Sequence, residues 1–138
     1  MAWIFRDFVN DSGENEVRQW IDSLDVKRAR IKIDVRLRDL EKVEQLRYPY
    51  VEKWVGESDL YEVRVVFAGV QYRLLGCYGP GRKEFSLLVG ATMRDDKLEP
   101  RNAVTIAKSR MSLIEDWRRT CEHFEQDQKT DAQRPEGS

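Results

Sequence analysis

The most informative chemistry in this sequence belongs to two arginines, Arg64 and Arg73, on neighbouring predicted strands. The strands are joined by Ala68-Gly69, and a two-residue loop at that point places the two arginines directly opposite each other. Guanidinium groups that face each other across a hairpin destabilise the pair by about a few tenths of a kcal/mol. We therefore expect a partner between them: either an acid, for which Glu62 is the candidate because it lies diagonal to Arg73, or an anionic ligand.

Further polar residues are candidates for the same anion site. They are Arg94 and Lys97 after the strand that ends at Gly90, Lys53 on the preceding strand, and Gln71 on the arginine face of the hairpin. Planar arginine side chains bind phosphate through paired hydrogen bonds, so such a group on an exposed sheet favours a polyanion, and RNA fits the site. Tyrosine rings stack on unpaired bases, although strand alternation places Tyr61 and Tyr72 in the core.

The sequence offers little for metal or nucleophilic chemistry. Cys77 and Cys121 lie 44 residues apart and His123 is the only histidine. This spacing excludes a CxxC zinc site and a disulfide framework, so we expect no metal and no cofactor. His123 falls near the frayed end of the predicted last helix, where a surface residue is the better interpretation than an acid catalyst.

The elements that position these residues follow from hydrophobic periodicity. We predict a strand at 3–9, a helix at 14–23 capped by Ser12 or Asn15, and a second helix at 26–46. Strands follow at 51–55, 60–67, 70–77 and 84–90. The last helix opens near Pro100, and its apolar stripe runs at helical spacing from Ala103 to Phe124.

This order predicts an α+β fold. It has an N-terminal strand, two helices, an antiparallel sheet of three to four further strands and a C-terminal helix, with the helices on one face of the sheet. We expect residues 1–124 to form a single domain, because a chain of 138 residues suits one domain of ordinary size. Residues 125–138 are polar and contain Pro135 and Gly137, which predicts a disordered tail.

Charge is balanced overall but not along the chain. The 24 basic and 25 acidic residues give a net charge of -1. Residues 1–59 carry 11 basic and 13 acidic side chains (-2), residues 60–110 carry 9 and 5 (+4), and residues 111–138 carry 4 and 7 (-3). The basic middle segment contains the arginine hairpin, so the total charge does not argue against an anionic partner.

No apolar stretch approaches the roughly 18 residues of a membrane span and no signal peptide is present, so we expect a cytoplasmic protein without a membrane partner.

Three short motifs carry a family resemblance: Leu60-Tyr61-Glu62-Val63-Arg64, Gln71-Tyr72-Arg73-Leu74-Leu75 and Leu87-Leu88-Val89-Gly90. In order and spacing they resemble the RelE/ParE superfamily of bacterial toxins, especially its phage-derived, HigB-like branch. The match extends through Pro100 and the helix that contains Ala107, and covers roughly residues 50–110. The strand-helix-helix start also agrees with the layout of that family.

The resemblance implies a toxin of a type II toxin-antitoxin system, held inactive by a cognate antitoxin that is often a helix-turn-helix DNA-binding protein. Many members are ribosome-dependent endoribonucleases that cut mRNA in the A site and thereby block translation, without a metal. It further implies that Arg64 and Arg73 stabilise the phosphate and the transition state, with Arg94 or Lys97 near the leaving group. Lys53, Lys97 and Gln71 would contact RNA.

The sequence departs from the family pattern in three places. Gly90 is followed by Ala91-Thr92-Met93-Arg94, where HigB-like relatives commonly have an aromatic residue and two lysines, and one residue is inserted before Pro100. The C-terminal tyrosine or histidine of several active members has no counterpart.

An arginine is a poor general base because its pKa exceeds about 12, so the proton acceptor is not identified. Two alternatives stay open: a ParE-like inhibitor of DNA gyrase, and a toxin-fold protein without activity that only binds its antitoxin.

Overall fold

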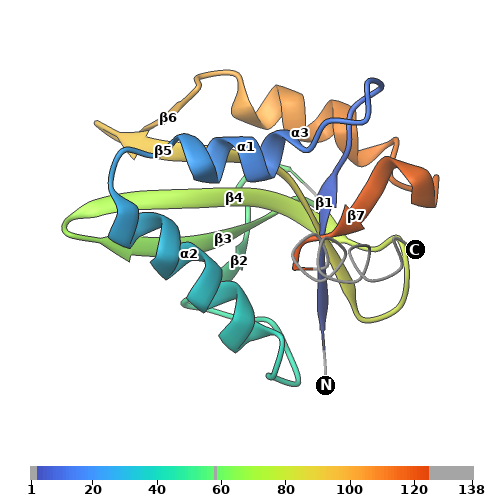
Figure 1. Cartoon of the computed structure of the whole chain (residues 1–138), viewed down its shortest axis with the longest axis horizontal. Coiled ribbons are helices and arrows are strands. Elements are labelled where there is room, and N and C mark those ends of the chain that lie inside the picture. The colour runs from blue at the N-terminus through green and yellow to red at the C-terminus, as the bar shows by residue number, and fades with distance from the viewer. Residues whose placement is uncertain (1–2, 58, 125–138) are drawn as a thin grey trace, which may run out of the picture.

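The computed structural model describes residues 3–57 and 59–124. The helices and strands in these residues follow in this order: β1 (Ile4–Phe8), α1 (Glu16–Ser23), α2 (Lys27–Leu40), β2 (Val51–Lys53), β3 (Tyr61–Phe67), β4 (Val70–Tyr78), β5 (Glu84–Arg94), β6 (Lys97–Glu99), α3 (Ala103–Met111), the 3-10 helix η1 (Trp117–Arg119) and β7 (Thr120–Glu122). The expected α+β fold is confirmed (Figure 1). The expected tail at 125–138 lies outside the described residues.

The strands form one mixed sheet in the order β2-β3-β4-β5-β1-β7, and β6 pairs with β5. All pairs are antiparallel except β1 with β5, which is parallel. The sheet is therefore larger than the expected three to four further strands and is not purely antiparallel. The parallel pair arises because the chain leaves β1 through the two helices and three strands before β5 returns beside it, a crossover that allows equal directions.

The first two helices cover one face of the sheet. Asn15 caps α1, since its Oδ1 accepts a hydrogen bond from the Arg18 amide at 2.8 Å. The buried residues of α2 are Ala29, Ile33, Leu37 and Leu40, the steps of three and four that predicted this helix. Helix α2 ends at Leu40, six residues before the predicted end.

Helix α3 lies on the opposite face, so the expectation that all helices share one face was wrong. A Cβ atom on Gly90 would lie 2.1 Å from Trp20 Cε3 of α1. Val89 and Ala91, its neighbours on β5, belong instead to the hydrophobic cluster that includes Ala103 and Ala107 of α3. Because successive residues of a strand point to opposite faces, α1 and α3 must sandwich the sheet. An apolar stripe indicates that a helix packs on the sheet, but it does not indicate on which face of the sheet.

The end of the described chain also differs from the prediction. The last helix stops at Met111 instead of continuing to Phe124, and residues 120–122 form β7, which pairs with β1. Figure 1 shows these two strands side by side although they come from opposite ends of the sequence. The pairing gives β1 its backbone partners: Val9 N donates to Arg119 O at 2.7 Å and His123 N to Phe5 O at 2.8 Å. No described helix is long and apolar enough to cross a bilayer.

Candidate functional site

The β3–β4 hairpin has the predicted register. Arg64 pairs with Arg73 and Phe67 with Val70, so the loop contains two residues. Ala68 has φ 52 and Gly69 has φ 80, two successive positive values that a tight hairpin turn with the right-handed strand twist requires. The predicted opposition of the two arginines is therefore confirmed, and it follows from local turn chemistry.

Glu62 lies between the two arginines. Its Oε1 is 2.5 Å from Arg73 Nη1, and its Oε2 is 3.2 Å from Arg64 Nη2. Glu62 is 4% exposed and Arg73 is 8% exposed, so the central pair is buried. Of the two expected partners, the acid is the one present in the structure. Arg73 also donates a hydrogen bond to Gln71 Oε1, which orients its guanidinium along the strand.

A second carboxylate, Glu52, also reaches this cluster. It is the cross-strand partner of Glu62 on β2, and its Oε1 lies 2.8 Å from Arg64 Nη2. That oxygen is buried and makes no hydrogen bond, so the contact with Arg64 is an ion pair without hydrogen-bond geometry. The sequence analysis missed Glu52; the like charge directly opposite Glu62 was the signal that could have identified it.

Two more cations arrive from α2. Lys32 Nζ donates to Val66 O at 2.8 Å, and Arg36 Nη1 donates to Arg64 O at 2.9 Å. These carbonyls are on the part of β3 that extends beyond β2. No neighbouring strand of the described chain provides hydrogen-bond donors to the carbonyl groups there, so side chains of α2 provide them. Among the described residues no carboxylate lies within ion-pair distance of Lys32 or Arg36. Both side chains were missed from the sequence because only the helix packing brings them to the sheet edge.

Lys32, Arg36, Arg64 and Arg73 line one cavity of about 350 Å³, together with Pro49, Tyr50, Val66 and Gln71, whereas Glu52 and Glu62 do not line it. Arg64 and Arg73 are balanced by Glu52 and Glu62. Lys32 and Arg36 add two positive charges that are balanced by carbonyl oxygens alone. The cavity, hereafter the arginine pocket, therefore has a surplus of two positive charges, and this local potential suits an anion such as phosphate.

The other predicted site residues do not join the arginine pocket. Arg94 and Lys97 pair at the end of the β5–β6 hairpin and line a separate hollow with Arg101. Met93 packs in the α3-side cluster, so strand alternation places Arg94 on the sheet face opposite to Arg73. Lys53 is opposite Tyr61 and lines another hollow with Trp54. The structure thus brings together Arg64, Arg73 and Gln71 only.

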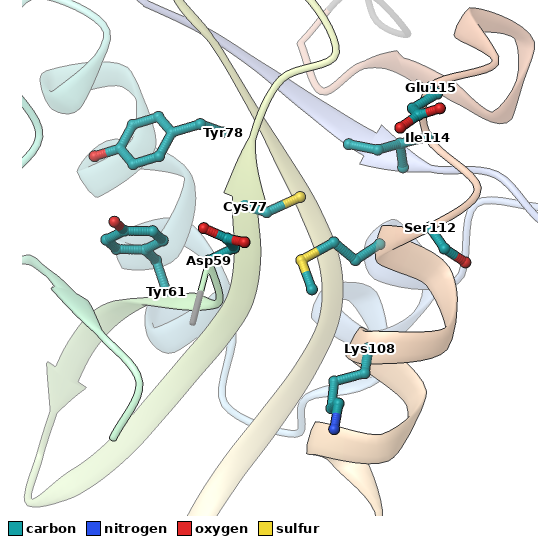
Figure 2. Close-up of a pocket in the computed structure, with 9 residues that line it drawn as sticks. Asp59, Tyr61, Cys77, Tyr78, Lys108, Ser112, Ile114 and Glu115 are labelled. Atoms are coloured by element: carbon teal, nitrogen blue, oxygen red, sulfur yellow. The ribbon is translucent and has the colours of Figure 1, made fainter. Parts of the chain in front are cut away.

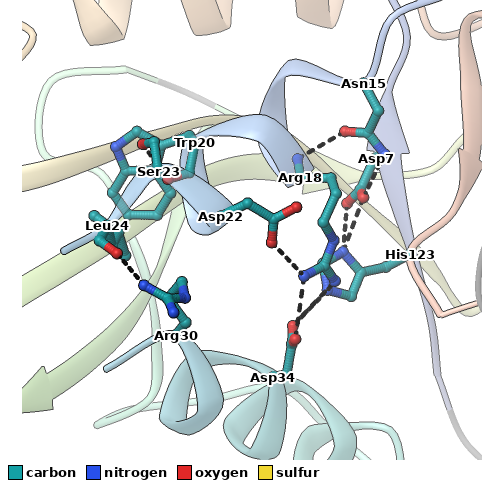
Figure 3. Close-up of polar contacts among 10 residues, drawn as sticks. All are labelled: Asp7, Asn15, Arg18, Trp20, Asp22, Ser23, Leu24, Arg30, Asp34 and His123. Atoms are coloured by element: carbon teal, nitrogen blue, oxygen red, sulfur yellow. Dashed lines mark hydrogen bonds and ion pairs between the residues drawn. The ribbon is translucent and has the colours of Figure 1, made fainter. Parts of the chain in front are cut away.

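The interpretation of His123 as a surface residue near a helix end was wrong. His123 is 1% exposed and follows β7. Figure 3 shows it between two carboxylates: Nδ1 is 2.8 Å from Asp7 Oδ1, and Nε2 is 2.9 Å from Asp34 Oδ1. Arg18 holds Asp34 through two contacts of 3.2 Å. This cluster joins β1, α1, α2 and the chain after β7, and its members do not line the arginine pocket.

The surroundings of His123 determine its charge. Burial lowers the pKa of His123, and the positive charge of Arg18 lowers it further. The negative charge of Asp7 and the hydrogen bonds with Asp34 and Asp7 raise the pKa by more than these two effects lower it. The net result raises the pKa to about 9. At neutral pH the imidazolium therefore donates to both carboxylates, a role that stabilises the fold rather than one that transfers protons near neutral pH.

A second cavity, of about 460 Å³, lies between β4 and α3 (Figure 2). Cys77 and Ile114 are buried in its wall, and Asp59, Lys108 and Glu115 are at its rim. Burial, assisted by the charge of Asp59, raises the pKa of the Cys77 thiol to about 12. A thiol with this pKa is protonated at neutral pH and is a weak nucleophile. None of the predicted site residues lines this cavity.

No group of three or more His, Cys, Asp or Glu side chains in residues 3–57 and 59–124 is placed to hold a metal ion. Comparison of the chain with protein-family models, with curated proteins and with solved structures finds no match. The case for a function is therefore made from the geometry of the arginine pocket and from the motifs that surround it.

Proposed function

We propose that this chain is a toxin of the RelE/ParE superfamily, of the HigB-like branch, that binds mRNA at the arginine pocket and cleaves it on the ribosome. The observation that carries the proposal is the gathering of Lys32, Arg36, Arg64 and Arg73 around one cavity with a surplus of two positive charges. Two of these residues belong to the motifs that resemble the family. Planar guanidinium groups bind phosphate oxygens through paired hydrogen bonds, and a phosphodiester offers such oxygens.

The reaction assigns a task to each polar group. The ribose 2′ oxygen bonds to phosphorus, the bond from phosphorus to the 5′ oxygen breaks, and a 2′,3′-cyclic phosphate forms. Arg64 and Arg73 donate hydrogen bonds to the phosphate oxygens, whose negative charge increases in the transition state. None of the described residues that line the pocket is a carboxylate, so the proton of the 2′ hydroxyl passes to solvent. The departing 5′ oxygen takes a proton from solvent.

The proposal includes two partners. The ribosome presents single mRNA codons, which compensates for the weak attraction that a net charge of -1 exerts on free RNA. A cognate antitoxin, expected to be a helix-turn-helix protein, holds the toxin inactive by placing acidic side chains against the arginine pocket. The protein acts in the cytoplasm, where its ribosomal target is located.

The test combines induced expression in bacteria with mRNA cleavage in a reconstituted translation reaction. The parent protein is expected to stop growth and cut translated mRNA, whereas Arg36→Ala and Arg64→Ala reduce cleavage at least about 100-fold, as the loss of one charge-stabilising group does. Arg28→Ala is the matched control: an exposed arginine on α2 that does not line the pocket. We expect it to leave cleavage unchanged.

Uncut mRNA with the parent protein would overturn the nuclease assignment. A gyrase supercoiling assay with the same preparation then distinguishes the two remaining functions. Loss of supercoiling would indicate a ParE-like inhibitor, and no effect in either assay would indicate a protein that only binds its antitoxin. Arg94→Ala and Lys97→Ala complete the set, because their residues lie away from the arginine pocket and we expect both variants to keep at least part of the activity.

A further inference from the structure

Tyr50 is fixed beside the paired arginines by backbone contacts. The Arg64 amide donates to Tyr50 O at 2.8 Å, and Tyr50 N donates to Arg47 O at 3.2 Å. Val51 pairs with Val63, so Tyr50 continues that register opposite Arg64, and Arg64 is opposite Arg73. The three residues therefore form one row across β2, β3 and β4. Tyr50 and Arg73 are two strand spacings apart, about 10 Å.

One face of the Tyr50 ring is covered by Arg36, and the other face is exposed. Arg36 Cζ lies 4.0 Å from the ring centroid, so the guanidinium covers one face of the ring. Arg36 is itself fixed by its 2.9 Å hydrogen bond to Arg64 O. Tyr50 nevertheless remains 44% exposed and lines the arginine pocket. The exposed area must come from the face and edge that Arg36 does not cover.

We propose that the open face of Tyr50 is a stacking platform for an unpaired nucleobase, whose own phosphate lies on Arg64 and Arg73. This proposal rests on the proposed function and specifies its substrate as single-stranded RNA. In a duplex both faces of each base are covered by neighbouring bases, so the platform accepts a base only from a single strand. The Arg36–Tyr50 contact is already formed without RNA, which reduces the entropy lost on binding.

The test is a binding cycle with two probes and two proteins. The probes are fluorescently labelled hexa-adenylate RNA and the same RNA with abasic ribose at the two central positions, measured by anisotropy at low ionic strength. We expect Tyr50→Leu to weaken hexa-adenylate binding about tenfold, the typical effect of removing one base stack. The abasic probe should bind the parent protein with that same reduced affinity and be insensitive to Tyr50→Leu. Tyr50→Phe keeps the ring and should bind hexa-adenylate as the parent does.

Tyr48→Leu is the matched control, because Tyr48 is 68% exposed two residues away and does not line the pocket. It should leave both affinities unchanged, and a duplex of equal length should bind the parent at least about tenfold more weakly than the single strand. The proposal is overturned if Tyr50→Leu binds hexa-adenylate as the parent does, or weakens both probes equally. If Arg64→Ala weakens both probes while Tyr50→Leu weakens neither, the platform is wrong and the phosphate site stands. If the parent binds neither probe and cuts no mRNA, both proposals fall.

Discussion

The buried histidine makes stability depend on pH in a way that can be calculated. The pKa of His123 is raised from 6.5 to about 9 in the folded chain. Its contribution to stability is complete below pH 6.5 and is lost as pH rises towards 9, because over that range only the folded state keeps the proton. A shift of this size corresponds to about 3 kcal/mol in total, at 1.36 kcal/mol per pKa unit.

We expect the free energy of unfolding, measured by urea titration, to fall by about 2 kcal/mol between pH 6.5 and 8.5. The range ends at pH 8.5 because the Cys77 thiol, whose pKa is raised from 9.0 to about 12, adds a second loss at higher pH. His123→Gln keeps a hydrogen-bond donor but cannot titrate. Since His123 is the only histidine, the difference between the two pH profiles isolates its contribution.

A parent profile that is flat within about 0.5 kcal/mol, well below the expected change, would refute this reasoning. So would His123→Gln with the same slope as the parent. The imidazole can also be followed directly by NMR, where it should titrate near pH 9 in the folded protein and near 6.5 in urea. Agreement of the two measurements would assign the pH dependence to the Asp7–His123–Asp34 contacts.

Three further predictions concern single side chains. Burial raises the pKa of Asp34, but hydrogen bonds from His123 and Arg18 outweigh burial and lower it. The contribution of Asp34 to the free energy of unfolding is therefore present above pH 3.8 and lost at lower pH. Asp34→Asn should make the free energy of unfolding depend less on pH in the acid range. Glu62→Gln leaves Arg73 buried without its carboxylate and should cost about 3 kcal/mol. Added inorganic phosphate should raise the melting temperature of this variant more than that of the parent, and an equal rise in both would contradict the anion site. Gly90→Ala places a Cβ 2.1 Å from Trp20 and should cost about 3 kcal/mol by overpacking, whereas Val55→Ala, at a residue 91% exposed, should change the urea midpoint little.

The arginine hairpin could be predicted because its determinants are local. A two-residue Ala68-Gly69 loop determines the register, and strand alternation then decides which side chains share a face. For the same reason Glu62 could be named as the partner of Arg73. Helix α2 was identified from its period of three and four, although its end was predicted six residues too late. Helix propensity continues across Glu41 and Lys42, although the helix ends at Leu40.

The rest of the site depended on contacts that are distant in sequence. Lys32 and Arg36 reach the edge of β3 only because α2 packs beside it, and Glu52 enters through the pairing of β2 with β3. No local turn brings Arg94 to Arg73, and β5 places Arg94 on the other face of the sheet.

The C-terminal segment shows the same division most clearly. By itself, the sequence determined which residues of 103–124 are apolar, and Ile114 and Phe124 are buried, whereas Trp117 is 57% exposed. Only the tertiary structure decided that residues 120–122 form a strand, because β1 provides backbone partners that a helix cannot use. It likewise decided that His123 is buried and charged, since Asp7 and Asp34 come from β1 and α2. Local composition predicts that most of an apolar stripe is buried, whereas hydrogen-bond partners and charge depend on which distant segments meet.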